Sequence, residues 1–253
     1  MTAFVTSADI AAGLRALGVR EGGIMLAHSS LKRFGHVEGG AEAVIDGLLA
    51  AVGAAGTVMV PTITGTASHG PDDPPVLDVV NTPCWTGIIP ETLRRRPGAI
   101  RSLHPTHSVA ALGPQADFLT KDHFTCGSPC GSNSPYLRLA ELDGVVVFLG
   151  TDLNCCTLLH GVEELADCRY HMQTAPSPGT IITTDGRELH GTFRLHQWGT
   201  PRRFPVLESR FLEWGIIRIG RVGDAEVRVL RAKPTVERVT ELLRQKPRYL
   251  VAE

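Results

Sequence analysis

A histidine and a glutamate three positions apart are the residues of this chain best suited to acid–base chemistry. His160 and Glu163 lie in the segment 158–166, whose apolar residues recur at helical spacing, so both side chains would share one helix face. An imidazole oriented by a carboxylate is a common general base in enzymes. The alternative is a structural histidine beside a surface glutamate, and the surrounding elements must decide between them.

The residues before this pair predict a buried strand. Residues 145–149 are all apolar and stand between Gly144 and Gly150, which is typical of a strand covered on both faces. A helix that begins just after such a strand has its first turn at the carboxyl end of the sheet, where open α/β sheets keep their sites. The pattern therefore favours a site at His160.

A second polar turn follows another predicted strand, residues 23–27. Residues 28–30 (His-Ser-Ser) come next, and residues 39–52 read as a helix before a strand at 57–61. This is the order of a βαβ unit. Hydroxyls and uncrowded amides at the turn would suit a diphosphate or pantetheine chain, although a plain turn explains the serines equally well. The spacing matches neither a P-loop nor the dinucleotide-binding glycine motif.

Five segments together give the chain a distinctive pattern. They are residues 28–35 with 39–40, 56–62, 101–113, 134–137 and 157–163. In content, order and spacing these segments resemble the aminoglycoside 3-N-acetyltransferases, a family of enzymes that use acetyl-CoA. The resemblance covers about two thirds of the chain and weakens toward the C-terminus.

The resemblance implies a fold and a set of roles. It implies a three-layer α/β/α-like fold with a mixed central sheet, in which residues 1–253 form one domain or two closely packed lobes. It makes His160 the catalytic base and Glu163 the partner that orients it. The segments that would line the acetyl-CoA site contribute His28, Ser29, Ser30, Leu31, Lys32, Phe34, Gly35, Arg101, Ser102, His107, Ser108 and Val109.

The chemistry of acyl transfer determines what such a site must contain. An amine attacks a thioester only when it is unprotonated, so a base must take its proton, and the developing oxyanion needs hydrogen-bond donors. We expect backbone amides of residues 28–30 to supply those donors. His104 and His107 are rival bases, but they stand in a segment that the resemblance assigns to cofactor contact. His160 is therefore the favoured base.

Length and composition agree with an enzyme of this kind. The chain has 253 residues, of which 43% are hydrophobic, so it is long enough to bury a sizeable core. A formal net charge of −1 disfavours a nucleic-acid or membrane-surface protein. Because the N-terminus lacks a signal-peptide pattern and no apolar run approaches membrane-spanning length, we expect a cytoplasmic protein. We expect a monomer or homodimer that acts on a small-molecule amine.

The cysteines permit more than one interpretation. There are six, and in a cytoplasmic chain we expect reduced, metal-free thiols. Two alternatives remain open, a zinc site and a Cys156 nucleophile paired with a histidine, although Cys156 is also a suitable small apolar filler. The residues that could converge on zinc are Cys126, Cys130, Cys155, Cys156, His160, Cys168 and His171.

The sequence leaves the acceptor open. An aminoglycoside is a polycation, and its pocket should display several carboxylates. The stretch 190–203 instead carries histidines and arginines. We expect Asp72, Asp73 and His196 to contact the acceptor. Three hypotheses remain: an aminoglycoside N-acetyltransferase, an acyl-CoA-dependent N-acyltransferase for a less cationic amine, and a non-catalytic or zinc-binding α/β protein on the same scaffold.

The orientation of two arginines bears on that choice. If Arg202 and Arg203 point into the pocket, they would repel a polycation. If they face solvent or pair with Glu208 and Asp185, loop aspartates such as those at 72, 73 and 78 could form an acidic pocket.

The remaining patterns predict elements that frame these segments. They are a capped helix over 7–17, a long functional loop over 62–83, a helix over 86–97, a hairpin over 180–195 that turns at Asp185-Gly186, helices at about 205–214 and 235–245, and a strand over 225–231.

Overall fold

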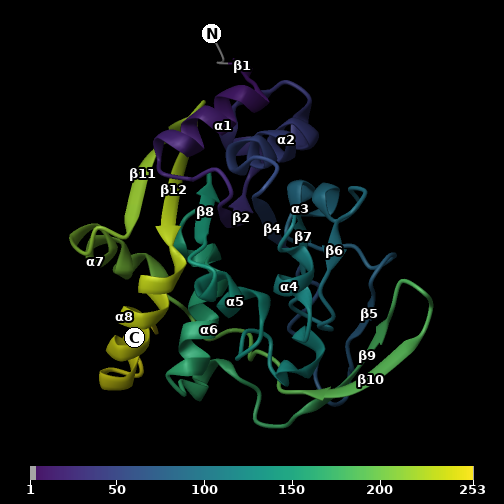
Figure 1. Cartoon of the computed structure of the whole chain (residues 1–253). Coiled ribbons are helices and arrows are strands. Elements are labelled where there is room, and N and C mark those ends of the chain that lie inside the picture. Colours follow the sequence, from purple (N-terminus) through teal and green to yellow (C-terminus); the bar gives the residue numbers. More distant parts are fainter. Residues whose placement is uncertain (1–3, 253) are drawn as a thin grey trace.

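A seven-stranded mixed sheet forms the centre of the molecule in the computed structural model, which describes residues 4–252 (Figure 1). The strand order is β11-β12-β8-β2-β4-β7-β6. The three central strands run parallel and the outer strands are antiparallel to their neighbours. The strands are β2 (Ile24–Ser29), β4 (Thr57–Pro61), β6 (Ile100–Arg101), β7 (Val109–Leu112), β8 (Val145–Leu149), β11 (Ile217–Val222) and β12 (Ala225–Arg231).

The predicted βαβ unit is present as β2, helix α2 (Gly40–Val52) and the adjacent parallel strand β4. The predicted boundary of its first strand is corrected. Strand β2 continues through Ser29 because His28 and Ser29 pair with Phe148 and Leu149 of β8. His28 and Ser29 are therefore held in the sheet itself, and the turn begins only at Ser30.

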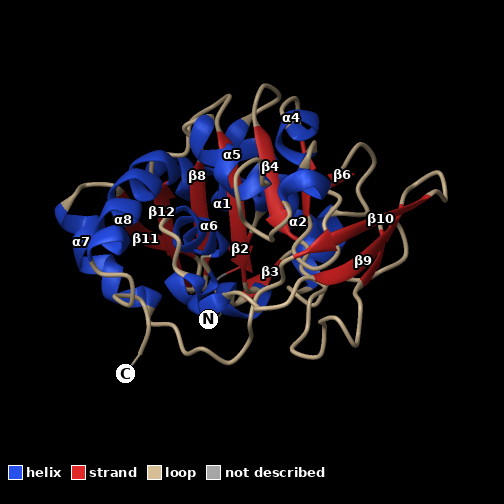
Figure 2. Ribbon diagram, turned by 90° about the horizontal axis from the view of Figure 1, so that it is seen from below, coloured by secondary structure: helices blue, strands red, loops and turns tan. Residues whose placement is uncertain are grey.

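Helices cover both faces of the sheet (Figures 1 and 2). Side chains alternate along β2, so Met25 packs against one group of helices and Leu26 against the other. The first group contains α1 (Ser7–Ala16), α2 and α3 (Ile88–Leu93). The second contains α4 (Ala116–Thr120), α5 (Pro135–Glu141), α6 (Thr157–Leu165), α7 (Glu208–Glu213) and α8 (Ala232–Gln245). The predicted three-layer α/β/α arrangement is confirmed.

A smaller sheet lies beside the central one, at the side away from α7 and α8 (Figures 1 and 2). It has the order β10-β9-β5, formed by β9 (Ser177–Ile182), β10 (Glu188–Phe193) and β5 (Val76–Asp78). Strands β9 and β10 form the predicted hairpin, and Gly186 adopts the positive φ of 79° that its turn requires. The predicted loop over 62–83 contributes β5 to this sheet. A two-stranded sheet joins β1 (Phe4–Val5) and β3 (His36–Val37).

Several predicted helix boundaries change. The helix expected over 86–97 is limited to α3. The expected capped helix begins at Ser7, and its cap is Thr6, which forms a reciprocal capping box with Asp9. The helix expected from 235 begins at Ala232. Single turns of 3-10 helix occur at η1 (Leu31–Phe34), η2 (His123–Cys126), η3 (Leu153–Cys155), η4 (Arg169–His171) and η5 (Phe204–Leu207). Within residues 4–252, no helix combines the length and apolar character needed to cross a bilayer.

The connection from β8 to α6 positions the site. Gly150 follows β8 with a φ of 67°, and a side chain there would collide with that of Arg33. Gly150 therefore allows the η1 segment to pack close to the end of β8. Helix α6 then begins at Thr157, beside the carboxyl ends of the parallel strands, as the apolar run at 145–149 predicts.

Candidate active site

His160 and Glu163 form a hydrogen-bonded pair on α6. The Nδ1 atom of His160 lies 2.7 Å from Oε2 of Glu163. The histidine side chain is 24% exposed, whereas that of Glu163 is fully buried. Because the carboxylate accepts a hydrogen bond at Nδ1, the neutral imidazole carries its proton there and leaves Nε2 as an acceptor. The shared helix face expected from the i, i+3 spacing is confirmed.

Three further groups surround the Glu163 carboxylate. Its Oε1 accepts hydrogen bonds from Tyr170 Oη at 2.6 Å and from Arg202 Nε at 3.1 Å, and His171 Nδ1 lies 4.0 Å from Oε2. Burial alone would raise the pKa of Glu163, but the His160 hydrogen bond and the charges on His160, His171 and Arg202 hold it at about 2. Glu163 is therefore an ionised carboxylate with both oxygens engaged.

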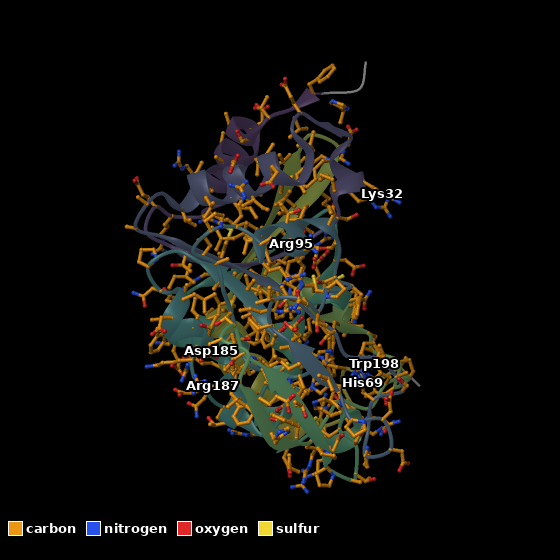
Figure 3. All side chains as sticks on the ribbon, turned by 90° about the vertical axis from the view of Figure 1, so that its right-hand side faces the viewer. Lys32, His69, Arg95, Asp185, Arg187 and Trp198 are labelled. Carbon is orange, nitrogen blue, oxygen red and sulfur yellow. The ribbon has the colours of Figure 1, made fainter. Side chains whose placement is uncertain are left out.

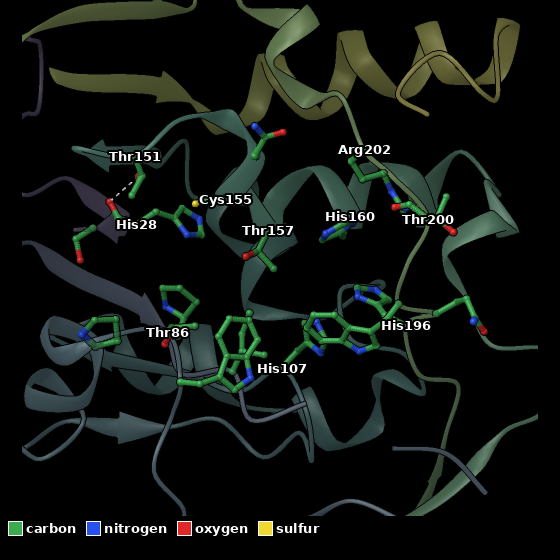
Figure 4. Close-up of a pocket in the computed structure, with 18 of the residues that line it drawn as sticks. His28, Thr86, His107, Thr151, Cys155, Thr157, His160, His196, Thr200 and Arg202 are labelled. Atoms are coloured by element: carbon green, nitrogen blue, oxygen red, sulfur yellow. Dashed lines mark hydrogen bonds between the residues drawn. The ribbon is translucent and has the colours of Figure 1, made fainter. Parts of the chain in front are cut away.

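A cavity of about 420 Å³ opens beside this pair. Figure 4 shows its residues arranged from His28 and Cys155 at one end to Thr200 and Arg202 at the other, with Thr157 and His160 between them. The described residues that line it include no aspartate and no glutamate. Its polar lining consists of hydroxyls, imidazoles, amides, a thiol and the Arg202 guanidinium.

Two more histidines line the cavity and are buried. The His196 ring lies 5.0 Å from the His160 ring and 4.5 Å from the His107 ring, centre to centre. Burial lowers the pKa of His107 to about 3 and that of His196 well below its usual value, so both are neutral at physiological pH. His104 is fully buried outside the cavity lining, where its Nδ1 accepts the amide hydrogen of His107.

The predicted cofactor residues His28 and Ser29 line the cavity and have unpaired polar atoms. Neither His28 Nε2 nor Ser29 Oγ has a hydrogen-bond partner among the described residues, although both atoms are buried. The His28 ring stacks on Phe148 at 5.5 Å, and burial lowers the pKa of His28 to about 3. Buried polar groups normally have partners, so this end of the cavity fits a polar ligand.

The rest of the first cofactor segment is dispersed. Phe34 lies in the core, Lys32 projects from the surface (Figure 3), and Gly35 has a φ of 82°. Leu31 is half-buried. The Ser30 amide, one of the expected oxyanion donors, instead donates to the Leu149 carbonyl at 2.9 Å, so this part of the prediction is corrected.

The second cofactor segment contributes mainly His107. Arg101 is buried outside the cavity lining and donates to the hydroxyls of Thr62 and Ser108 and to three backbone carbonyls, so its guanidinium is engaged in anchoring loops. Ser102 is hydrogen-bonded to His123 at 2.8 Å, and Val109 lies in the core as part of β7.

The predicted acceptor contacts are brought together only in part. His196 lines the cavity, but Asp72 and Asp73 lie on an exposed turn outside its lining, where Ser68 donates to Asp73 at 2.7 Å. This bond and the backbone bridge between Gly70 and Asp73 close the turn on itself. The two carboxylates are therefore left out of the cavity lining.

Each of the two arginines follows a different one of the expected arrangements. Arg202 lines the cavity and pairs with buried Glu163, whereas Arg203 is exposed and donates to the Tyr249 carbonyl at 3.1 Å. The carboxylates considered as partners are used elsewhere. Glu208 pairs with Arg228, and Asp185 pairs with Arg187 on a part of the surface away from Trp198 (Figure 3).

Sequence reasoning missed several residues of this cavity. Trp85 and Trp198 contact each other with ring centres 5.9 Å apart, although they are 54% and 40% exposed. Thr157 begins α6 and also lines the cavity, and Tyr170 reaches Glu163 from η4. A tryptophan in a segment rich in Gly and Pro is a sequence signal for a ligand site. Nothing in the sequence around Tyr170 indicates its contact with Glu163.

The neighbouring thiols of Cys155 and Cys156 lie in different environments. Cys155 lines the cavity, whereas Cys156 is buried outside its lining, and burial raises the pKa of the Cys156 thiol to about 12. A protonated, buried thiol agrees with the interpretation of Cys156 as an apolar filler. The zinc set considered from the sequence does not converge; among the described residues the potential metal ligands that do converge are Cys130, Glu164 and His196.

Comparisons with known proteins find similar sequences over most of the chain. A sequence model described as aminoglycoside 3-N-acetyltransferase matches residues 26–244, which extends well past the point where the resemblance in the sequence weakens. Aminoglycoside N(3)-acetyltransferase VII of Streptomyces paromomycinus is 39% identical over 92% of this chain and 89% of its own length.

Solved structures show the same similarity. AAC-IIIb, determined as a binary complex with CoASH, has a TM-score of 0.82 at 28% identity and covers 96% of this chain and 98% of its own. A mutant of aminoglycoside acetyltransferase AAC(3)-IVa, determined in complex with a gentamicin, has a TM-score of 0.85 at 29% identity and covers 100% of this chain and 93% of its own.

Proposed function

The chain belongs to the aminoglycoside 3-N-acetyltransferase family, and from that premise we propose that it transfers the acetyl group of acetyl-CoA to the 3-amino group of an aminoglycoside. The observation that carries the proposal is the bond of 2.7 Å between His160 and buried Glu163 at the wall of the cavity. The proposal includes a cytoplasmic location, where acetyl-CoA is available.

His160 acts as the general base. Its Nε2 takes a proton from the acceptor amine as the nitrogen attacks the thioester carbonyl carbon, and the tetrahedral intermediate then collapses with loss of the CoA thiolate. The proton held on His160 passes to the departing sulfur, so the products are the acetamide and CoASH. Ionised Glu163 keeps the proton of the neutral ring on Nδ1 and stabilises the imidazolium that forms.

The rival bases are less suited to this role. A base with a pKa of about 3, as burial imposes on His107, has little driving force to take a proton from an amine near neutral pH. His104 does not line the cavity at all. Of these three histidines, only His160 both lines the cavity and hydrogen-bonds to a carboxylate.

Acetyl-CoA occupies the end of the cavity at His28. The unpaired His28 Nε2 and Ser29 Oγ atoms supply polar contacts to the pantetheine chain, and exposed Lys32 lies in the adjoining η1 segment, where a cosubstrate phosphate can meet it. The Thr157 hydroxyl has no partner among the described side chains and lies between the two ends of the cavity (Figure 4). It donates to the thioester oxygen as negative charge develops there.

The acceptor occupies the end formed by His196, Trp198, Thr200 and Arg202. Sugar rings present C–H groups that pack on tryptophan, and ammonium groups are attracted to the faces of aromatic rings. A second candidate function, acyl transfer to a less cationic amine, is favoured by one observation: the described lining carries no carboxylate.

Turnover of acetyl-CoA tests the proposal. Purified protein is mixed with acetyl-CoA and a panel of amines, and free CoASH is detected with a thiol reagent. We expect amine-dependent thiol release with some aminoglycosides and saturable CoA binding by calorimetry. A folded sample that binds no CoA at millimolar concentration would exclude both acyltransferase functions and leave a non-catalytic protein.

A further inference from the structure

Glu164, next to the catalytic pair, is a buried carboxylate without a cationic partner. Its side chain is 9% exposed, and no arginine or lysine among residues 4–252 forms an ion pair with it. It accepts from Ser128 Oγ at 2.5 Å and from the Cys130 amide at 3.0 Å, and it meets His196 Nε2 at 3.2 Å. Arg169, which lines the same region, pairs with Asp167 instead.

Buried carboxylates are costly unless a charge compensates them. Here the groups around the carboxylate are themselves potential metal ligands. One Sγ atom of Cys130, one carboxylate oxygen of Glu164 and one ring nitrogen of His196 all lie within 4.8 Å of one another. None of the proposed steps of acetyl transfer uses Cys130 or Glu164.

From this juxtaposition we propose that Cys130, Glu164 and His196 bind a zinc ion, which departs from the expectation of metal-free thiols. Thiolate, imidazole and carboxylate are the three ligand types that zinc accepts in tetrahedral sites, whereas calcium and magnesium prefer oxygen alone. A water molecule completes the coordination. Because Cys130 loses its proton on binding, thiolate and carboxylate together balance the charge of the ion.

The backbone brings these ligands together at a close contact between elements. Gly161 lies on α6 one turn before Glu164, and a Cβ atom there would lie 2.8 Å from the Cys130 carbonyl oxygen. Glycine inside a helix is destabilising relative to alanine, so its presence here requires a reason. It allows the Cys130 segment to pack directly on the helix that carries Glu164.

An entry route leads to the proposed site. A second cavity, of about 360 Å³, is lined by Cys126, Ser128, Glu164 and Cys168 among others, and it does not include His196. The active-site cavity includes His196 but not Glu164. A zinc ion between these two ligands would therefore load from the second cavity and act on the active site only through His196.

This arrangement gives the ion a positioning role rather than a catalytic one. Zinc bound to His196 Nε2 would fix the orientation of a ring that packs 5.0 Å from His160 and 4.5 Å from His107. Ser128 and the Cys130 amide, which already hold the carboxylate, would orient it as a ligand. The ion is thus expected to stiffen the acceptor end of the cavity without contacting the reacting atoms.

Metal content and thermal stability test the proposal independently of activity. Protein purified without chelator should contain about one zinc per chain by elemental analysis, and zinc added to the apoprotein at 100 times its dissociation constant should raise Tm by about 5 °C or more. Cobalt substituted for zinc should give a thiolate-to-metal absorption band. A wild-type protein that binds neither metal stoichiometrically would overturn the proposal.

Variants locate the site. Cys130→Ser and Glu164→Gln should each lose the zinc-dependent rise in Tm, and Cys130→Ser should also lose the cobalt–thiolate band. Cys126→Ser is the matched control, because Cys126 lines the entry cavity without belonging to the ligand set. Each variant is compared with itself with and without metal, which separates lost binding from lost folding. Unchanged zinc binding in both ligand variants would show that the ion sits elsewhere.

Discussion

The Tyr170 hydroxyl lies 2.6 Å from Oε1 of Glu163, the oxygen that His160 leaves free. Burial and the neighbouring Glu163 charge raise the pKa of Tyr170, so its hydroxyl stays protonated and donates. Tyr170 and His160 thus hold the carboxylate from opposite oxygens. The pair on α6 is therefore part of a larger network that reaches η4 and the Arg202 segment.

Removal of the His160 imidazole should abolish most turnover. We expect His160→Ala to lower kcat by about 10²-fold or more and to leave CoA affinity nearly unchanged, because a general base acts on the transition state. Steady-state kinetics and calorimetric titration of CoA measure the two effects. His190→Ala, an exposed histidine on β10, is the control and should behave as wild type. Near wild-type kcat in His160→Ala would transfer the role to another residue.

Tyr170→Phe tests the support of the carboxylate. Loss of one hydrogen bond to Glu163 should lower kcat by roughly 3- to 10-fold, in keeping with about 1 kcal/mol for a buried bond of this kind. The KM for acetyl-CoA should not change, since Tyr170 lies outside the cavity lining. If Tyr170 has only a packing role, Tm will fall while kcat of the folded enzyme stays constant.

Local sequence patterns predict much of the frame and less of the site. Three features are determined by neighbouring residues and follow from the sequence. They are the strand at 145–149, the helix face shared by His160 and Glu163, and the hairpin that turns at Asp185-Gly186. The Arg202–Glu163 pair spans 39 residues and joins helix α6 to the irregular segment that carries Arg202. Such contacts depend on loop paths that tertiary packing determines.

Arg101 shows the same limit. An arginine near a predicted cofactor segment suggests a phosphate contact, but here its guanidinium is consumed by loop carbonyls and by the Thr62 hydroxyl. Burial decides between these uses, and the neighbours of Arg101 in the sequence do not encode how deeply its side chain is buried. The unpaired atoms of His28 and Ser29 likewise depend on the continuation of strand β2 through Ser29, which the local sequence pattern does not predict.

Trp198 should determine acceptor affinity. Trp198→Ala removes an aromatic face that is 40% exposed beside His196, so we expect KM for the acceptor to rise by about 10-fold. The dissociation constant of CoA should remain unchanged because the proposed cosubstrate site lies at the His28 end. Trp214→Ala, on a tryptophan that packs against Phe211 outside the cavity, controls for general destabilisation. Equal KM values for wild type and Trp198→Ala would remove Trp198 from the acceptor site.

Buried His28 should make the fold sensitive to acid. Its folded-state pKa is about 3, because burial disfavours the charged form, while the unfolded chain takes up this proton near pH 6.5. Between these values the unfolded state binds more protons, so stability falls as pH is lowered, by up to about 1.4 kcal/mol per pH unit. Above about pH 6.5 His28 is neutral in both the folded and the unfolded state, so none of this stability is lost.

Urea unfolding at several pH values measures this slope in wild type and in His28→Gln. The variant should lose less stability between about pH 7 and pH 5 than wild type, because its side chain does not titrate. Near pH 8, the difference between the free energies of unfolding of the two proteins measures any stability lost because the variant packs less well on Phe148. Identical slopes in the two proteins would mean that His28 takes up its proton equally readily in the folded state.

The charge state of the acceptor end decides between the two candidate substrates. If Arg202 had no carboxylate partner, its repulsion of each nearby ammonium group would raise the free energy of the bound state by several kcal/mol at an effective dielectric of about 20. Its Nε, however, lies 3.1 Å from Glu163, and Arg203 points to the Tyr249 carbonyl, so the lining presents a compensated pair rather than free positive charge. Polycations should therefore bind.

We expect gentamicin-type and kanamycin-type acceptors to show micromolar KM values and a higher kcat/KM than a monoamine of similar size. Their multiple ammonium groups can meet the faces of Trp85 and Trp198 while one deprotonated amine reaches His160. Steady-state kinetics at fixed, saturating acetyl-CoA measures this ratio, and Arg203→Ala, which alters an exposed arginine outside the lining, should leave it unchanged. Efficient turnover of the monoamine alone would show instead that a pocket without carboxylates selects a less cationic amine.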